Sequence, residues 1–291
     1  MRQKLIDDLL AAAGAQGNGL ARAALVIARI EYPRLDPDPY LSQLDAMGEA
    51  ARRAIARQVE ATGDRSCLSC VTAVNDYLFQ ELGFVGNRER YEDPRNSCLN
   101  EVLERRTGIP ITLSLVYMEV AARAGLQIDG VNFPGHFLVR CPDANNRTKG
   151  LIIDPFHAGA LLSEHDCRLL LQRHVGAEAA FSRSLLSSAT RQQVIVRMLL
   201  NLKRIYVNMR SFPQARVVTE LLLAITPSAL SELRDRGLLA YHLNDVTSAL
   251  RDLQTYLKLS GMTELDSETR EEHEQIWEHV KTLRRRVAAL N

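Results

Sequence analysis

The 291-residue chain has no long uninterrupted apolar run. A helix that crosses a bilayer needs roughly 20 consecutive apolar residues, whereas the longest apolar stretch here, residues 109–120, contains Glu119 and is soon followed by Arg123. Residues 1–13 mix charged with apolar side chains, so they lack the apolar core of a secretory signal peptide. These absences predict a soluble protein that is not exported and has no membrane partner.

The chain also lacks an excess of charge of either sign. Its 36 basic and 35 acidic residues leave a formal charge of +1, so no global field attracts nucleic acid or an anionic membrane. Nucleic acid is therefore not an expected partner. With 46% hydrophobic and 24% charged residues, the composition is that of a globular chain, and the length fits two domains.

Cysteine is scarce and irregularly spaced. Five cysteines, an odd number, form no recognisable disulfide framework, so we expect free thiols in a reducing compartment and a cytoplasmic location. Cys67 and Cys70 form one Cys-x-x-Cys pair, but no second pair and no suitably spaced histidine complete a zinc site. Cys141 and Cys167 are expected in the core. The sequence therefore predicts no metal ion and no cofactor.

Helical periodicity is clear in three segments before residue 88. Apolar residues recur at intervals of three and four within residues 20–30, 40–61 and 67–82. Proline or glycine follows each segment and ends it. Two further helices are predicted at 97–106, with Ser97 as a cap, and at 111–124. The second starts with Pro110 in its first turn and stops before Gly125.

After Gly125 the apolar period becomes that of strands. Residues 128–133, 136–141 and 151–154 read as three short strands in meander order, which predicts antiparallel pairing. A helix at 163–174 follows. Helices combined with a small antiparallel sheet predict an α+β domain over residues 1–185, with a helical part at 1–88 and a core at 89–175.

The C-terminal part shows an internal repeat. Residues 205–215 and 239–249 align at an offset of 34 residues, which is the period of tetratricopeptide (TPR) repeats. Pro227 and Gly261 fall at matching unit ends, and a final amphipathic helix from about Asp266 to Leu290 would cap the array. We therefore predict an all-α, TPR-like domain over residues 186–291, with a domain boundary near 176–190.

Candidate site residues gather between positions 91 and 159. A helix that starts after Pro110, a strand that opens with His136 and a strand that ends in Asp154 follow the order of a papain-like or transglutaminase-like triad. In such triads an imidazole deprotonates a thiol at a helix N-terminus, and a carboxylate orients the imidazole. From the residues alone, the favoured readings are that His136 starts a strand and bonds to neighbouring backbone and that Asp154 forms an Asp-Pro turn.

Four segments resemble the bacterial SirB-type family. They are YEDPRNSCLN (91–100), VLERRTGIPITLS (102–114), GVNFPGHFLVR (130–140) and IDPF (153–156). The resemblance covers nearly the whole chain. It implies a transglutaminase-like core, of the papain-like cysteine-protease superfamily, followed by a TPR-like region, and the core is also similar to a region of certain eukaryotic F-box proteins. It also implies that His136 and Asp154 meet as a pair.

The nucleophile is where the sequence departs from the transglutaminase pattern. Active members carry a cysteine in the first turn of the helix that here begins at Pro110, and this turn has Thr112 and Ser114 instead. A hydroxyl gains much less from a helix dipole than a thiol does. Cys98, from the preceding helix, is either a displaced nucleophile or a small buried apolar residue. The resemblance places the histidine and the aspartate at His136 and Asp154, and Cys98 completes the candidate remnant triad.

The remaining polar residues of this region have two readings. Asn96, Asn100, Arg105 and Arg106 either line the site with Thr112 and Ser114, or cap helices and pair with acidic residues. No pattern assigns a role to the other histidines, which are His157, His165, His174, His242, His273 and His279.

Two functions follow as hypotheses. The favoured one is a protein-interaction or regulatory module, in which a degenerate cleft binds a peptide or protein segment and the TPR-like groove docks another partner. The alternative is a thiol hydrolase or acyl-transfer enzyme acting on an amide bond, with His136 as base, Asp154 as its orienting group and Cys98 as nucleophile. A purely structural role in a larger assembly has no sequence feature that separates it from the first.

Overall fold

The computed structural model describes residues 2–15, 19–143, 150–260 and 267–289. Gly261, Asp266, Leu290 and most of the loop predicted at 142–150 lie outside the described residues. The chain divides into two compact units, residues 7–198 and residues 1–6 with 199–291. The domain boundary expected after residue 185 falls within the short 3-10 helix η4 (Arg183–Leu186). The division between the two units comes later in the chain, after residue 198.

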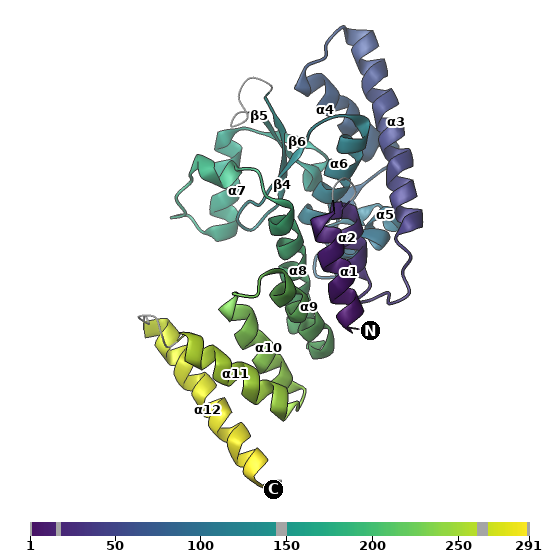
Figure 1. The fold of residues 1–291 in the computed structure, drawn as a ribbon. Coiled ribbons are helices and arrows are strands. Elements are labelled where there is room, and N and C mark those ends of the chain that lie inside the picture. The colour runs from purple at the N-terminus through teal and green to yellow at the C-terminus, as the bar shows by residue number, and fades with distance from the viewer. Residues whose placement is uncertain (1, 16–18, 144–149, 261–266, 290–291) are drawn as a thin grey trace. The chain divides into compact units, whose positions relative to one another are not determined.

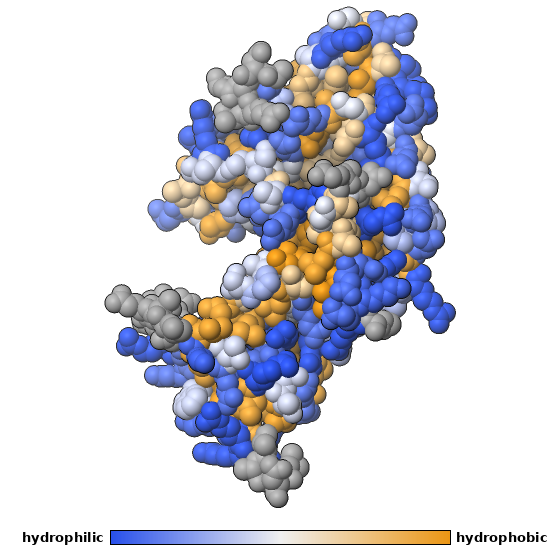
Figure 2. All heavy atoms as spheres, viewed as in Figure 1, coloured by the Kyte–Doolittle hydropathy of each residue, from blue (hydrophilic) through white to orange (hydrophobic). Residues whose placement is uncertain are grey.

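The larger unit begins with helices (Figure 1). They are α1 (Arg2–Gly14), which continues from the other unit, α2 (Gly19–Ala28), α3 (Asp38–Thr62), α4 (Cys67–Asn75) and the π-helical turn η1 (Asp76–Glu81). The three predicted helices correspond to α2, α3 and α4 with η1. Helix α3 buries Leu41, Leu44 and Met47 and packs along the central helix α6 (Pro110–Ala124). The outer edge of α3 is mostly hydrophilic (Figure 2), as an amphipathic helix requires.

Helix α6 has the predicted ends. Pro110 lies at its start, where a missing N–H costs no hydrogen bond. Gly125 ends it in the left-handed conformation, with φ of 86°. Nearly every side chain of α6 is buried, including Glu119, which pairs with Arg123 and accepts a hydrogen bond from the backbone N–H of Ala21 at 3.1 Å. The helix is therefore the core element on which the site is built.

The helix expected at 97–106 is shorter than predicted, and its cap is different. A separate 3-10 helix, η2 (Pro94–Ser97), comes first, because Asp93 accepts a hydrogen bond from the N–H of Arg95 and Pro94 fixes the first turn. Helix α5 (Leu99–Arg105) begins only after Cys98. Ser97 thus belongs to η2 and is not the cap of α5. Two short parallel strands, β1 (Val85–Gly86) and β2 (Thr107–Gly108), flank this region.

The predicted antiparallel meander is present. Strands β3 (Asp129–Val131), β4 (Leu138–Pro142), β5 (Gly150–Asp154) and β6 (Ala160–Leu162) pair in sequence order. Helix α7 (Glu164–Val175) covers one face through Cys167, Leu170 and Leu171, which pack on Leu138 and Ile152. Strand β6 was not predicted. His136 does not open a strand: its N–H donates to Phe133 O at 3.1 Å, so it closes the turn before β4.

The prediction of five free thiols is wrong. Cys67, at the start of α4, is joined to Cys141 in β4 by a disulfide, with the two Cα atoms 6.6 Å apart. The free cysteines are Cys70, Cys98 and Cys167. The sequence argument for a reducing compartment loses this support. Among the described residues no helix is both long and apolar enough to cross a membrane.

The smaller unit is all helical. Its helices are α8 (Arg191–Asn208), shared with the larger unit, α9 (Phe212–Ile225), α10 (Leu230–His242), α11 (Val246–Ser260) and α12 (Ser267–Ala289). Arg210 and Asn244, which are 34 positions apart, both adopt positive φ, of 56° and 57°. Ala215 and Ala249 are both fully buried. The repeat predicted from the sequence is therefore a structural repeat, and α12 packs on α11 through Ile276, Val280 and Leu283.

Candidate functional site

His136 and Asp154 meet beside the sheet. Because Val139 pairs with Ile153 in the antiparallel register, the end of β5 lies next to the start of β4. The turn before β4 then brings His136 Nε2 to 3.0 Å from both carboxylate oxygens of Asp154. Both side chains are almost completely buried. The Asp154 carboxylate thus contacts the His136 imidazole as the orienting carboxylate of a triad contacts its base.

The Asp154 carboxylate has two more partners. It accepts a hydrogen bond from the N–H of Phe156 at 3.0 Å and lies 2.7 Å from Nδ1 of His157, in the 3-10 helix η3 (Pro155–His157). Burial alone raises the pKa of Asp154, but the hydrogen bonds and charges of His136 and His157 outweigh burial and lower it. The carboxylate is therefore held in its charged form.

Two histidines to which the sequence assigned no role surround this pair. The ring of His136 stacks with that of His157 at 5.9 Å and with that of His174, from α7, at 5.6 Å. Burial and the charges of His136 and Arg173 lower the pKa of His174. The place of His157, three residues after Asp154, was readable from the sequence. That of His174 was not, because it depends on how α7 lies against the turn at Gly135.

The first turn of α6 holds hydroxyls that are already engaged. Thr112 Oγ1 donates to Asn96 O at 2.7 Å and accepts from the N–H of Ile109, the residue before the helix, at 3.1 Å. Ser114 Oγ donates to Phe137 O at 3.3 Å. Both residues are fully buried. At the position of the family nucleophile, the two hydroxyls thus hold backbone in place.

Cys98 has the environment of a structural thiol. It is 1% exposed, and its Sγ lies 3.6 Å from Pro94 O. Burial, with the charges of Glu31 and Glu101, raises its pKa to about 12. A thiol nucleophile needs a depressed pKa. Cys98 therefore lacks the environment that a displaced nucleophile needs. No geometric observation supports a catalytic role for Cys98.

Three of the four remaining predicted site residues hold local structure. The Asn96 side chain donates to Arg90 O at 2.7 Å and accepts from Asn87 and from Arg105, each at 3.1 Å. Arg106 ends α5 in the left-handed conformation and donates to Leu82 O at 2.8 Å. Asn100 is buried, and its Oδ1 has no partner among the described residues. The catalytic assignment of the whole set stays a prediction.

Comparisons with known proteins agree with this architecture. Residues 38–200 match the model of the transglutaminase-like superfamily, and residues 202–278 match that of the tetratricopeptide repeat. A UPF0162 protein of Xylella fastidiosa (strain Temecula1) is 40% identical over 247 residues, which are 84% of this chain and 85% of that protein. This chain belongs to the UPF0162, or SirB-type, family.

More distant relatives match a smaller share of this chain. Protein SirB1 of Salmonella typhimurium is 29% identical over 181 residues, 62% of this chain and 66% of that protein. F-box only protein 21 of Mus musculus is 36% identical over 180 residues, which are 59% of this chain and only 28% of that protein. The resemblance read from the sequence is thereby confirmed, for the transglutaminase-like core and for the TPR-like region of this SirB-type chain.

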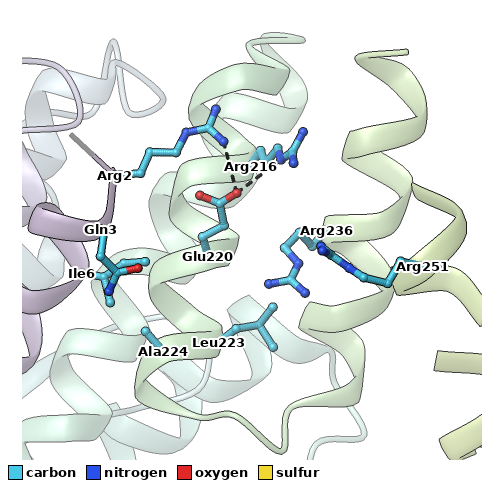
Figure 3. A pocket seen from close by; sticks show the side chains of 9 residues that line it. All are labelled: Arg2, Gln3, Ile6, Arg216, Glu220, Leu223, Ala224, Arg236 and Arg251. Carbon is cyan, nitrogen blue, oxygen red and sulfur yellow. Dashed lines mark hydrogen bonds and ion pairs between the residues drawn. The ribbon is translucent and has the colours of Figure 1, made fainter. Parts of the chain in front are cut away.

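The smaller unit of this SirB-type protein has a second candidate site. A pocket of about 420 Å³ lies among α1, α9, α10 and α11 and is lined by four arginines, Arg2, Arg216, Arg236 and Arg251, with Glu220 as its acidic side chain (Figure 3). Arg2 and Arg216 contact Glu220 at 3.4 and 3.3 Å. Arg236 and Arg251 both form ion pairs with Asp252, whose side chain is buried.

A second pocket of about 520 Å³ adjoins the first, since Leu223 and Arg236 line both. Its lining is more apolar and includes Pro227, Leu230, Leu233 and Leu259. Leu259 is 43% exposed. A cationic pocket thus continues into an apolar one on the same unit.

Proposed function

We propose that this chain is a protein-interaction or regulatory module whose transglutaminase-like cleft does not carry out acyl transfer or hydrolysis. The absence of a cysteine from the first turn of α6 supports this, together with the backbone hydrogen bonds of Thr112 and Ser114. The raised pKa of Cys98 supports it further. An imidazole–carboxylate pair without a nucleophile has no means of forming a covalent intermediate.

The partner in this proposal is a protein segment with acidic side chains next to an apolar one. The observation that carries it is the pocket of four arginines, which continues into the apolar pocket around Leu230 and Leu259. Arginine binds carboxylates through paired hydrogen bonds, and stacked helix pairs form grooves suited to peptides. The side chains of Arg2 and Arg251 are 54% and 65% exposed, so both guanidinium groups are accessible to such a segment.

Binding of fluorescent peptides to the full-length protein tests this proposal. A peptide rich in Glu and Leu is compared with one of equal length rich in Lys and Leu, at low and high salt. We expect binding of the acidic peptide only, with an affinity that falls as salt rises. The double variant Arg2→Ala/Arg251→Ala should weaken binding about 10-fold, since two exposed charge contacts together contribute about 1.4 kcal/mol.

Arg285→Ala is the matched control, because Arg285 is an exposed arginine of α12 that does not line the pocket. It should leave peptide binding unchanged. Equal binding of the acidic and basic peptides, or unchanged binding by the double variant, would overturn the assignment of the arginine pocket.

A further inference from the structure

We propose that His136, Asp154 and His157 form a binding site for a divalent transition-metal ion of the Zn²⁺ type. Each residue offers one ligand atom, and these three atoms lie within 4.8 Å of one another. The sequence predicted no metal site, because no cysteine and histidine spacing completed one, and it assigned no role to His157. The proposal is independent of peptide binding in the smaller unit, since all three residues belong to the larger one.

The distances suit a small ion. Zinc binds imidazole nitrogen and carboxylate oxygen at about 2.0–2.2 Å, which separates neighbouring ligand atoms of a tetrahedron by about 3.4 Å. The Asp154 carboxylate now lies 2.7 Å from His157 Nδ1 and 3.0 Å from His136 Nε2. An ion would require the side chains to rotate until the ligand atoms, now within 4.8 Å of one another, are separated by about 3.4 Å.

The types of ligand select the class of ion. Two imidazoles and one carboxylate suit Zn²⁺, Co²⁺ or Ni²⁺, whereas Mg²⁺ and Ca²⁺ prefer sites made of oxygen atoms. Three protein ligands leave the fourth tetrahedral position for water or an incoming side chain. When Nε2 of a neutral His136 binds the ion, its ring proton moves to Nδ1.

The surroundings orient the ligands and leave an entrance. The N–H of Phe156 bonds to Oδ1 of Asp154, which leaves Oδ2 for the ion. The ring of Phe156 packs edge-on against that of His136 at 6.0 Å and shields it. The side chain of His157 is 36% exposed, whereas those of His136 and Asp154 are 3% and 2% exposed. An ion would therefore reach the site past His157.

His157 distinguishes the proposed metal site from a remnant triad. A His–Asp pair that orients a base needs only His136 and Asp154. The additional imidazole of His157 on the same carboxylate has no part in that arrangement, but it completes a set of three ligands. The short helix η3, which joins Asp154 to His157, fixes their spacing.

Isothermal titration of the untagged, chelator-treated full-length protein with Zn²⁺ tests the site. We expect one ion per chain, a rise in Tm on addition of Zn²⁺, and the visible absorption of tetrahedral Co²⁺ when Co²⁺ replaces it. His157→Asn keeps the His136–Asp154 pair and should weaken Zn²⁺ binding by more than about 100-fold, because loss of a ligand exceeds the loss expected for an outer hydrogen-bond partner.

His165→Asn is the matched control, since His165 is an exposed histidine of α7 outside the cluster. It should bind Zn²⁺ as the unmodified protein does. The proposal is overturned if the unmodified protein binds no ion stoichiometrically, or if His157→Asn binds Zn²⁺ with unchanged affinity. Peptide binding by His157→Asn is measured in parallel. If it is retained, the loss of Zn²⁺ binding does not affect the proposed function.

Discussion

His157 Nδ1 lies 2.7 Å from Oδ2 of Asp154, closer to the carboxylate than His136 Nε2 at 3.0 Å. One buried carboxylate thus serves two imidazoles, of which one is buried and the other half-buried. The two contacts should contribute unequally to stability, because a buried pair that loses one partner is costly, whereas a partner that water can reach and replace contributes less.

Replacement of the two histidines should therefore have unequal effects. In the presence of a chelator, His136→Ala should lower the free energy of unfolding by about 3 kcal/mol, because it removes the buried partner of the Asp154 carboxylate and leaves only the half-buried His157. His157→Ala should lower it by about 1 kcal/mol or less. Urea denaturation monitored by circular dichroism measures both. Equal losses would contradict the unequal burial of the two rings.

The same carboxylate should make stability depend on pH. Burial raises the pKa of Asp154, but its bonds to His136 and His157 lower the pKa by a larger amount. The pKa in the folded protein therefore lies below that in the unfolded chain. The stabilisation is then present above about pH 3.9, the value of an unperturbed aspartate, and is lost as pH falls through the folded pKa. The difference in unfolding free energy between the unmodified protein and Asp154→Asn should shrink over that range. A difference that grows as pH falls would contradict the sign.

Thr112 offers a test of whether its hydroxyl is structural. Thr112→Val keeps the shape but leaves the N–H of Ile109 and the carbonyl of Asn96 without their partner. We expect a loss of about 1–3 kcal/mol in the free energy of unfolding. Thr112→Ser, which keeps the hydroxyl, should retain most of the stability. If valine is tolerated as well as serine, the Thr112 hydroxyl does not stabilise the start of α6.

The thiols should react in a fixed order. In the folded protein without reductant, iodoacetamide near pH 8 should modify the partly exposed Cys70 first and leave Cys98 and Cys167 unmodified, because burial raises their pKa values to about 12 and about 11. Unfolding should expose these three thiols, and reduction should add Cys67 and Cys141. Mass spectrometry of tryptic peptides gives the order. Rapid labelling of Cys98 in the folded protein would restore the thiol-enzyme hypothesis.

Features of this fold that depend on neighbouring residues could be predicted from the sequence. Pro110 and Gly125 mark the ends of α6, because the missing N–H of proline and the positive φ of glycine act within one turn. The 34-residue repeat is equally visible, since Ala215 and Ala249 meet the same packing requirement. The family pattern also paired His136 with Asp154, although neither residue alone decided between a site and a local turn.

Contacts between distant segments could not be predicted. Cys67 and Cys141 are 74 positions apart, and nothing near either residue indicates that α4 and β4 meet. His174 lies on a helix whose sequence specifies only its buried face. For the same reason the reading of Cys98 stayed open, since its pKa depends on burial and on the charge of Glu31, far away in the sequence.

Gly135 tests the close approach that brings His174 to the site. Its φ is +71°, and a Cβ at this position would collide with the side chain of His174. Gly135→Ala should lower the free energy of unfolding by more than about 1 kcal/mol, because it adds a clash to a strained backbone. The nearest clashing atom is the Cβ of His174. The double variant Gly135→Ala/His174→Gly removes this atom but not the positive φ, so it should recover part of the loss relative to His174→Gly alone. Gly63→Ala is the matched control, since its φ is +69° with open space around it. A cost at Gly135 no larger than that at Gly63 would mean that His174 can move aside, and that the stacking of its ring on His136 is not imposed by the turn.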